Sequence, residues 1–237
     1  MQKALLLIKK NNKLLAFTSL KPFDLKPVGF EKKLRPLLKT LRLEPSKISY
    51  ALQVHGAKVL VPRSLEFKNL CKADGFVTNR KNYLLCVFTA DCLPVVLYDP
   101  KAGCIGITHC GWRSTYKGIA GKAVLKMKKL FGSKAGDIRA VFGPSIRPCC
   151  YEVSTSLAAK FERRFGMKCV LKRENKVFLN LEEANRILLL KCGLKRSRIT
   201  SSKQCTFCGK KMFYSYRRDG KNTGRMVTGI IMTEAER

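Results

Sequence analysis

Short apolar runs of strand length recur along the chain and predict that strands form much of its core. Three of them follow one another closely, at residues 84–89, 95–99 and 104–109. Runs of about four to eight apolar residues are typical of buried strands. Pro100 and Gly103, between the last two runs, predict a hairpin there. We expect further strands at residues 4–8, 14–18, 48–54, 58–61, 138–142, 177–179 and 226–232 and, after a turn, within 73–78.

Apolar residues spaced three and four positions apart predict four helices. The longest, residues 118–131, alternates apolar and basic positions and ends at Gly132, a residue that suits the end of a helix. The same spacing predicts a helix at residues 34–43. Two more helices are predicted at residues 154–165 and 181–191. Each opens with a residue able to cap a helix, Ser154 for the first and Asn180 for the second. No internal repeat, low-complexity tract or long linker divides the chain, so we expect one domain over residues 1–237.

The charge is strongly basic, with 48 Lys and Arg against 16 Asp and Glu and a formal net charge of +32. Such a charge attracts phosphates, nucleic acid and anionic surfaces without selecting a sequence. The basic residues are spread along the whole chain, and aromatic residues do not alternate with them as a base-stacking surface requires. We therefore expect nucleic-acid binding to be non-specific at most, although a basic nucleic-acid-binding protein remains the alternative to an enzyme. No apolar stretch approaches the roughly 20 residues that a membrane span needs.

Eleven cysteines are many for a chain of 237 residues, and the number is odd. A disulfide framework would require secretion, but residues 4–8 are too short for the apolar part of a signal peptide and Lys9-Lys10 follow at once. Cys86 and Cys104 lie inside apolar runs, where a free cysteine packs as a small apolar side chain. These features predict a reducing, cytoplasmic location.

Residues able to bind a metal stand at the ends of predicted strands. Cys92 follows the apolar run 84–88, His109 follows the run 104–107, and His55 is the only other histidine in the chain. Two neutral imidazoles and one thiolate suit Zn²⁺ and leave a fourth position open. The alternative is a buried structural cysteine with two ordinary histidines. Asp91 and Gln53, beside the expected ligands, are candidates for partners of the metal ligands or for substrate contacts.

Two other groups of residues permit a function without requiring one. Cys205-Thr206-Phe207-Cys208 is a CxxC sequence, but it has neither a second CxxC nor a thioredoxin-like context, so we expect it, like Cys149-Cys150, to serve packing. Arg113 follows Gly111-Trp112, and Arg217 follows Tyr216. Arginine binds phosphate through two parallel N–H groups, and aromatic neighbours can orient it. The alternative, in so basic a chain, is a solvated or Asp-paired arginine.

Taken together, an ordered set of motifs over about residues 50–232 resembles the YfiH family, also called the laccase-domain or multicopper polyphenol oxidase-like family. In chain order the motifs are Gln53-Val54-His55-Gly56, Ala73-Asp74-Gly75, Thr89-Ala90-Asp91-Cys92-Leu93-Pro94, His109-Cys110-Gly111-Trp112-Arg113, Gly143-Pro144-Ser145-Ile146, Cys150-Tyr151-Glu152-Val153, Cys205-Thr206, residues 213–220 and Thr223-Gly224-Arg225. The resemblance implies a single α+β domain, a layered α/β/β/α sandwich with mixed sheets. It also implies a zinc site at His55, Cys92 and His109.

The activity implied by the resemblance is purine nucleoside phosphorolysis. Adenosine, inosine, guanosine or methylthioadenosine would react with phosphate to give the base and a ribose 1-phosphate, and the same site would deaminate adenosine. Arg113 and Arg217 are the candidates for binding phosphate, Gln53 and Asp74 for contacting substrate, and Asp91 or Asp74 for acid–base chemistry. The family also includes the names polyphenol oxidase and peptidoglycan-editing factor. Because two histidines cannot build a multicopper cluster, we expect zinc in preference to copper.

Three departures from the family pattern are visible. The usual N-terminal signatures are not recognisable between residues 21 and 47. Ser114 stands where glycine commonly follows Gly-Trp-Arg, and Arg147 stands where glycine is frequent, which adds positive charge beside the expected site.

Overall fold

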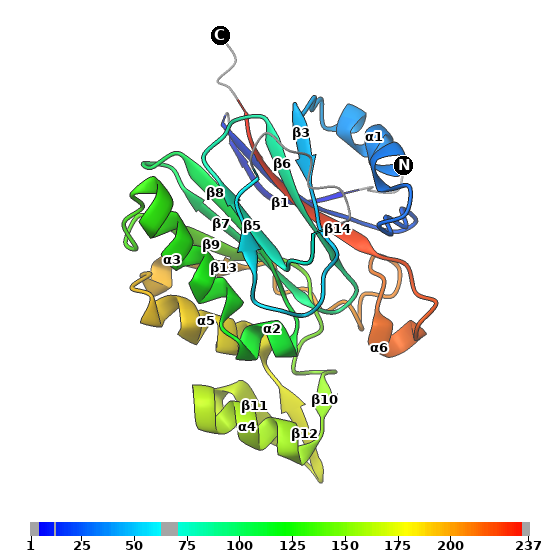
Figure 1. Cartoon of the computed structure of the whole chain (residues 1–237). Coiled ribbons are helices and arrows are strands. Elements are labelled where there is room, and N and C mark those ends of the chain that lie inside the picture. The colour runs from blue at the N-terminus through cyan, green and yellow to red at the C-terminus, as the bar shows by residue number, and fades with distance from the viewer. Residues whose placement is uncertain (1–4, 12, 63–70, 234–237) are drawn as a thin grey trace.

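Two stacked β-sheets form the centre of the molecule (Figure 1). The computed structural model of the chain describes residues 5–11, 13–62 and 71–233; residue 4, the start of the first predicted strand, lies outside them. The five-stranded sheet has the order β1 (Leu5–Asn11), β2 (Leu14–Ser19), β14 (Met226–Met232), β6 (Tyr83–Thr89), β3 (Lys47–Ser49). The six-stranded sheet has the order β13 (Ile199–Ser201), β9 (Arg139–Phe142), β7 (Leu93–Asp99), β8 (Cys104–Cys110), β5 (Gly75–Thr78), β4 (Val59–Leu60). Both sheets mix parallel and antiparallel pairs.

The apolar runs are continuous because the central strands are buried on both faces. In β6, Leu85 and Val87 face the other sheet, whereas Leu84, Cys86 and Phe88 pack in the cluster that contains α1. Side chains of successive strand residues point to opposite faces, so a strand covered on both sides needs apolar residues at every position. The predicted runs at 84–89 and 95–99 and the hairpin after them are confirmed as β6, β7 and β8.

Helices cover the outer face of each sheet. α1 (Phe30–Thr40) packs on the five-stranded sheet, and α3 (Ile119–Phe131) and α5 (Leu181–Lys191) pack on the six-stranded sheet. The predicted α/β/β/α sandwich of the α+β class is therefore confirmed. The single domain over residues 1–237 stays a prediction. Within the described residues, no helix is both long and apolar enough to cross a membrane.

A smaller unit projects from one end of the layers (Figure 1). Helix α4 (Thr155–Phe165) lies on a three-stranded sheet of the order β10 (Glu152–Val153), β12 (Lys176–Leu179), β11 (Val170–Arg173). Phe161 and Phe165 fill the space between them. The remaining short elements are the helices α2 (Trp112–Tyr116) and α6 (Tyr216–Asp219) and the 3-10 turns η1 (Met167–Cys169) and η2 (Arg196–Arg198).

Two predicted elements differ from the structure, each for a local reason. The strand expected at 48–54 is only β3, because the Gln53 side chain bonds the backbone of Phe88 and the chain leaves the sheet. The first helix starts at Phe30 and ends at Thr40, earlier than the predicted 34–43. Arg42 adopts a φ of 53° and the N–H of Leu43 bonds the carbonyl of Leu38, which is how a Schellman motif ends a helix.

Candidate metal and active site

The candidate site lies where the chain crosses from one sheet to the other. β6 belongs to the five-stranded sheet and β7 to the six-stranded sheet, so residues 90–92 connect the two layers. Cys92 ends this connection. His109 pairs with Pro94 in the β7–β8 ladder, near the end of β8 and beside the same connection.

His55, Cys92 and His109 converge, with their potential ligand atoms all within 4.8 Å of one another. His55 reaches this position from a loop in which its φ is 53°, an uncommon backbone conformation for a residue other than glycine. Gly111 makes room for the group, since a Cβ there would lie 2.7 Å from His55 Nδ1 and 3.0 Å from Cys92 Sγ. His109 is buried, while His55 and Cys92 are partly exposed. The group is therefore accessible from solvent on one side.

Asp74, at the entry to β5, holds both histidines in place. Its Oδ1 lies 2.9 Å from His109 Nδ1. Its two oxygens also accept hydrogen bonds from the backbone N–H groups of Val54 (3.2 Å), His55 (3.0 Å) and Gly56 (2.7 Å). Burial raises the pKa of Asp74, but the hydrogen bond and charge of His109 and the N–H groups of Gly56 and Val54 lower it overall. A carboxylate on one imidazole nitrogen leaves the other nitrogen, Nε2, for a metal.

The thiol and the buried imidazole shift each other's ionisation. Burial opposes the charged form of Cys92, but the charge and hydrogen bond of His109, followed by those of His55, lower its pKa to about 6. Burial likewise opposes the charged form of His109, but Cys92 and then Asp74 raise its pKa to about 9. At neutral pH without a metal, the pair is a thiolate and an imidazolium. A metal cation that binds the Cys92 thiolate and the His109 ring would displace the proton of this imidazolium.

The donor set fits a metal ion. Two imidazoles and a thiolate are common zinc ligands, and three protein ligands leave one tetrahedral position for water or substrate. The Asp74–His109 contact is the carboxylate–histidine arrangement that accompanies such sites. The glycine at position 111 lets the backbone approach the donors closely. The three side chains thus form a candidate metal site.

Asp91 connects this site to a distant part of the chain. It is buried, has a φ of 91°, and accepts three hydrogen bonds at its carboxylate. They come from Thr206 Oγ1 (2.6 Å), Ser215 Oγ (3.0 Å) and the backbone N–H of Arg217 (2.7 Å). The carboxylate therefore fixes α6 beside Cys92.

Gln53 is fully engaged with the backbone. Its Nε2 donates to the carbonyl of Phe88 (2.8 Å) and its Oε1 accepts from the N–H of Phe88 (2.6 Å). This pair of bonds attaches the loop of His55 to the end of β6.

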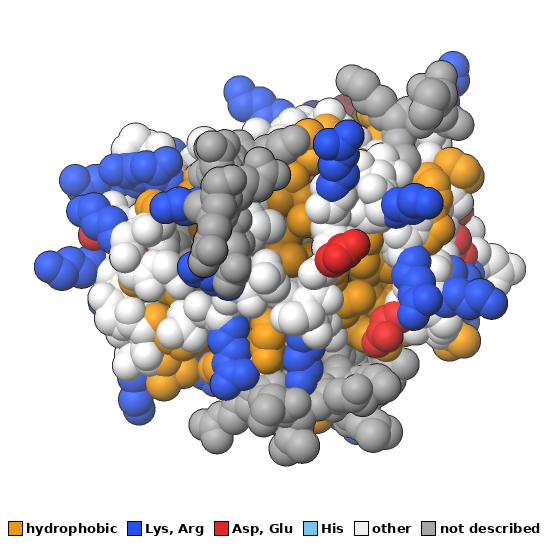
Figure 2. Space-filling view, turned by 90° about the horizontal axis from the view of Figure 1, so that it is seen from above, with side chains coloured by type: hydrophobic (Ala, Val, Ile, Leu, Met, Phe, Trp, Pro, Cys, Tyr) orange, Lys and Arg blue, Asp and Glu red, His pale blue; other side chains and the backbone are white. Residues whose placement is uncertain are grey.

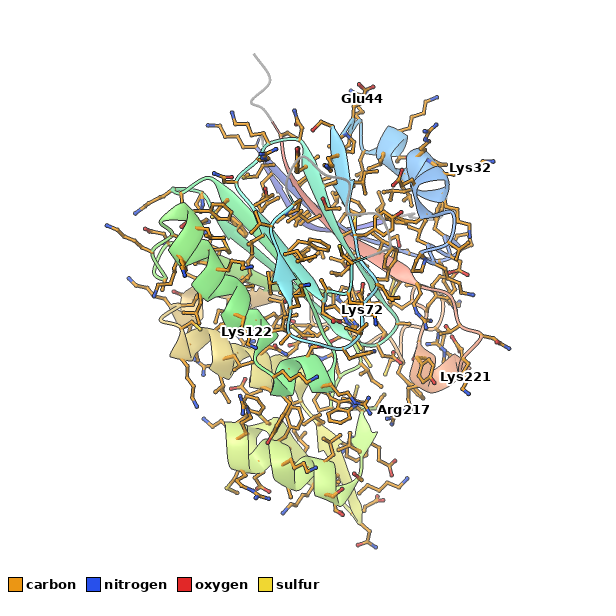
Figure 3. All side chains as sticks on the ribbon, in the orientation of Figure 1. Lys32, Glu44, Lys72, Lys122, Arg217 and Lys221 are labelled. Atoms are coloured by element: carbon orange, nitrogen blue, oxygen red, sulfur yellow. The ribbon has the colours of Figure 1, made fainter. Side chains whose placement is uncertain are left out.

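Arg113 and Arg217 approach the site from α2 and α6. Figure 3 shows Arg217 beside one end of β10. Its Nη1 donates to the carbonyl of Glu152 in that strand (2.8 Å). Arg113 lies over the ring of its neighbour Trp112 at 4.3 Å from the ring centre. The charges of both arginines act on Tyr151, over whose ring the Arg217 guanidinium lies at 5.3 Å. The two arginines therefore both contribute positive charge near Tyr151.

Tyr151 belongs to the motif Cys150-Tyr151-Glu152-Val153, but it was assigned no role from the sequence. Burial, and then the charge of Cys92, raise its pKa. Its hydroxyl is thus neutral, and the charges of Cys92, Asp91 and the two arginines act on it. The signals available in the sequence were this motif and its position directly after the loop 143–150, which follows a predicted strand.

Known proteins resemble the chain in sequence over most of its length. A family model described as multi-copper polyphenol oxidoreductase laccase matches residues 26–233. The purine nucleoside phosphorylase YlmD of Bacillus subtilis is 38% identical over 176 residues, which cover 72% of this chain and 63% of that protein. The purine nucleoside phosphorylase of Bacteroides thetaiotaomicron is 36% identical over 163 residues, covering 67% of this chain and 60% of that protein. These matches span less than two thirds of either relative.

Other similarities concern a second enzyme name and the fold. The adenosine deaminase RL5 of an unknown prokaryotic organism is 37% identical over 161 residues, covering 66% of this chain and 61% of that protein. The crystal structure of YlmD from Geobacillus stearothermophilus matches with a TM-score of 0.89 at 27% identity, covering 99% of this chain and 98% of that one. The Bacillus licheniformis protein YfiH matches with a TM-score of 0.88 at 30% identity, covering 97% of each chain. The layered α+β fold is therefore shared with these structures.

Proposed function

The chain belongs to the multi-copper polyphenol oxidoreductase laccase family, the family that its motifs resemble, and we propose that it is a zinc-dependent purine nucleoside phosphorylase. Its substrates would be purine nucleosides and inorganic phosphate. The names of two similar proteins support this activity. The observation that carries the proposal is the convergence of His55, Cys92 and His109 within 4.8 Å, beside two arginines whose charges act on one tyrosine.

The reaction replaces one bond at the ribose C1′ by another. The C1′–N bond to the purine breaks, its electron pair goes to the departing base, and a phosphate oxygen forms the new bond to C1′. The base takes up one proton, which balances the proton that hydrogen phosphate gives up. Arg113 and Arg217 bind the phosphate and hold it in line with the breaking bond. Their positive charge also lowers the repulsion between the phosphate and the negative charge that develops on the purine. A zinc ion bound by His55, Cys92 and His109 would supply a Lewis acid to polarise the substrate.

The carboxylates and Gln53 position these groups. Asp74 orients the His109 ring and the backbone of His55. Asp91 holds the backbone of Arg217, and Gln53 holds the loop of His55 against β6. Since the oxygens of both carboxylates already accept hydrogen bonds, we assign them positioning in place of the acid–base role expected from the sequence.

Adenosine deamination is the second candidate, because a similar protein is named adenosine deaminase. There water would add to C6 of adenine and ammonia would leave, without the use of phosphate. The Arg113 and Arg217 pair has no charged group to bind in that reaction. Removal of either arginine should therefore weaken phosphorolysis more than deamination.

Two other functions have less support. A laccase needs several coppers, and the two histidines of the chain are too few for such a cluster. A specific nucleic-acid-binding surface would gather its positive charge, whereas the Lys and Arg side chains on the face in Figure 2 stand in separate groups. Binding to nucleic acid should be weak and lost as salt rises.

Product chromatography tests the proposed function. Adenosine is incubated with the protein in the presence and in the absence of phosphate. Adenine and ribose 1-phosphate that form only with phosphate support phosphorolysis. Inosine as the sole product assigns the site to deamination, and adenine with free ribose in the absence of phosphate assigns it to hydrolysis.

A further inference from the structure

Two cysteine pairs far apart in the sequence lie together in the structure. β9 and β13 are parallel neighbours, so the loops that follow them leave the same edge of the sheet. The first loop holds Cys149-Cys150 and the second holds Cys205 and Cys208. A short bridge joins the loops, because Ser145 N–H donates to the carbonyl of Gln204 (3.3 Å) and the N–H of Thr206 donates to the carbonyl of Ser145 (3.0 Å). The CxxC sequence therefore has a second cysteine pair beside it in space, which the spacing along the chain did not indicate.

The four sulfur atoms form a compact group. All of them lie within 4.8 Å of one another. Cys208 Sγ is 3.3 Å from Cys150 Sγ and 3.9 Å from Cys149 Sγ. Four thiolates around a tetrahedral zinc ion, each about 2.3 Å from the metal, stand about 3.8 Å apart. The sulfurs thus have the spacing of a mononuclear site with only small adjustments of their rotamers.

Backbone donors also point at this group. The N–H groups of Cys208 and Arg147 donate to the sulfur of Cys205. Hydrogen bonds to thiolates from backbone N–H groups accompany and stabilise metal–cysteine sites. All four cysteines are free thiols. Cys149 and Cys208 are exposed, so a metal can enter from solvent.

We propose that Cys149, Cys150, Cys205 and Cys208 bind a structural zinc ion, at a second site separate from the group of His55, Cys92 and His109. Four thiolates complete the tetrahedral coordination of zinc and leave no position for substrate, which is typical of a structural site and not of a catalytic one. The CxxC spacing supplies two ligands from one tight turn. The proposal rests on the thiol cluster alone and is independent of the proposed function.

Two arginines brace the loops and offset the negative charge of a zinc tetrathiolate. Arg173 Nη2 donates to the carbonyls of Pro148 (3.0 Å) and Cys149 (3.1 Å). Arg218 Nη1 donates to the carbonyls of Thr206 and Phe207, both at 2.9 Å. Each guanidinium therefore holds the backbone of one cysteine pair from outside the group.

The second site would stabilise the edge of the first. Thr206, between Cys205 and Cys208, donates to Asp91, and Asp91 accepts from the backbone of Arg217. A metal that closes the two loops fixes Thr206 and, through Asp91, α6. Structural zinc sites contribute directly to folding free energy, so loss of this metal should loosen α6 as well as the loops.

Metal content measured on freshly purified protein tests the proposal. We expect about two zinc ions per chain in the unaltered protein, and about one in Cys208→Ser, Cys150→Ser and Cys92→Ser. Cys192→Ser is the control, because Cys192 is partly buried and outside both groups, and it should keep two. Equal zinc in Cys208→Ser and the unaltered protein would overturn the proposal.

X-ray absorption on Cys92→Ser covers the case in which the loop variants do not fold. That variant should retain a single zinc with four sulfur neighbours at about 2.3 Å. Zinc with nitrogen or oxygen neighbours instead, or iron in place of zinc, would contradict the assignment. Mass spectrometry detects the other alternative, a disulfide. A protein mass lower by two hydrogens, with Cys150 or Cys208 in the linked peptides, would show that the cluster forms a disulfide and not a metal site.

Discussion

The hydroxyl of Thr206 donates a hydrogen bond of 2.6 Å to Oδ1 of Asp91. These two residues connect the group of four cysteines with the group of His55, Cys92 and His109. Thr206 lies between Cys205 and Cys208, and Asp91 directly precedes Cys92. Both residues are buried, so the bond is shielded from water. The loop 204–208 is therefore part of the framework of the candidate active site.

Replacing Thr206 by Val should lower the free energy of unfolding and also raise the KM for phosphate. The change leaves a buried oxygen of Asp91 without its donor, which costs about 1–3 kcal/mol. Chemical denaturation gives the free energy of unfolding, and kinetics with inosine should show a higher KM for phosphate. Thr223→Val is the matched control, because Thr223 is also buried but donates at 3.4 Å to the more exposed Asp219. Equal behaviour of the two variants would show that the Thr206–Asp91 bond has no special role.

Replacing Asp74 by Asn should weaken metal binding. An amide cannot accept at both atoms, so His109 or the loop of His55 loses its support. Loss of such a partner of a metal ligand typically lowers metal affinity about 10–100-fold. Competition with a zinc chelator measures the affinity. Asp137→Asn, at a surface ion pair with Lys101, should leave it unchanged, and an unaltered affinity in Asp74→Asn would refute the positioning role.

The pH dependence of alkylation should distinguish Cys92 in metal-free protein. Burial raises the pKa of this thiol, but the charges and hydrogen bonds of His109 and His55 together outweigh burial and lower the pKa to about 6. The thiolate therefore persists above pH 6 and is lost as the pH falls through 6. Labelling with iodoacetamide, followed by mass spectrometry of peptides, should reach half its maximum rate near pH 6.

Two comparisons make the alkylation experiment decisive. Burial raises the pKa of Cys192, so its labelling should still increase above pH 8. In His109→Gln the cation is gone, and the midpoint for Cys92 should rise by more than about one pH unit. A midpoint for Cys92 near 9 in the unaltered protein would mean that the two residues do not form an ion pair. Zinc should protect Cys92 from the reagent at neutral pH and should be released as its ligands are protonated in acid.

Arg217→Gln and Arg113→Gln should each raise the KM for phosphate. A hydrogen bond to a charged group contributes about 1.5–3 kcal/mol, which corresponds to roughly a 10–100-fold change. Arg80→Gln is the control, since Arg80 also lies over a tyrosine ring, that of Tyr83, at 5.6 Å from its centre, but is exposed and outside the site. If neither arginine variant changes the KM for phosphate while both change that for the nucleoside, the phosphate-binding role is wrong.

The layered fold could be predicted from the sequence because strands buried on both faces have continuous apolar runs. β14 occupies the predicted residues 226–232, and α3 ends at Phe131, directly before Gly132, which adopts a left-handed conformation. Ser154 and Asn180 cap their helices as expected, each accepting from a backbone N–H three residues on. By contrast, β11 has exposed basic residues and no apolar pattern, so tertiary pairing with β12 alone makes it a strand.

The candidate site could be predicted only in part from the sequence. Strand ends located Cys92 and His109, but the role of Asp74 as a common partner of both histidines depends on the crossing of two sheets. The cysteine cluster was missed because its two pairs are separated by more than 50 residues along the chain. The parallel pairing of β9 and β13, which brings them together, has no signature in a single sequence.

Phosphorolysis of inosine by the zinc-containing protein and by Cys92→Ala tests the central claim most directly. Products are separated by chromatography, with and without phosphate, and zinc is quantified in the same samples. We predict hypoxanthine and ribose 1-phosphate from the unaltered protein only when phosphate is present. We predict neither product, and about one zinc fewer per chain, in Cys92→Ala that remains folded by circular dichroism. Undiminished phosphorolysis by Cys92→Ala, or base release that ignores phosphate, would contradict the account.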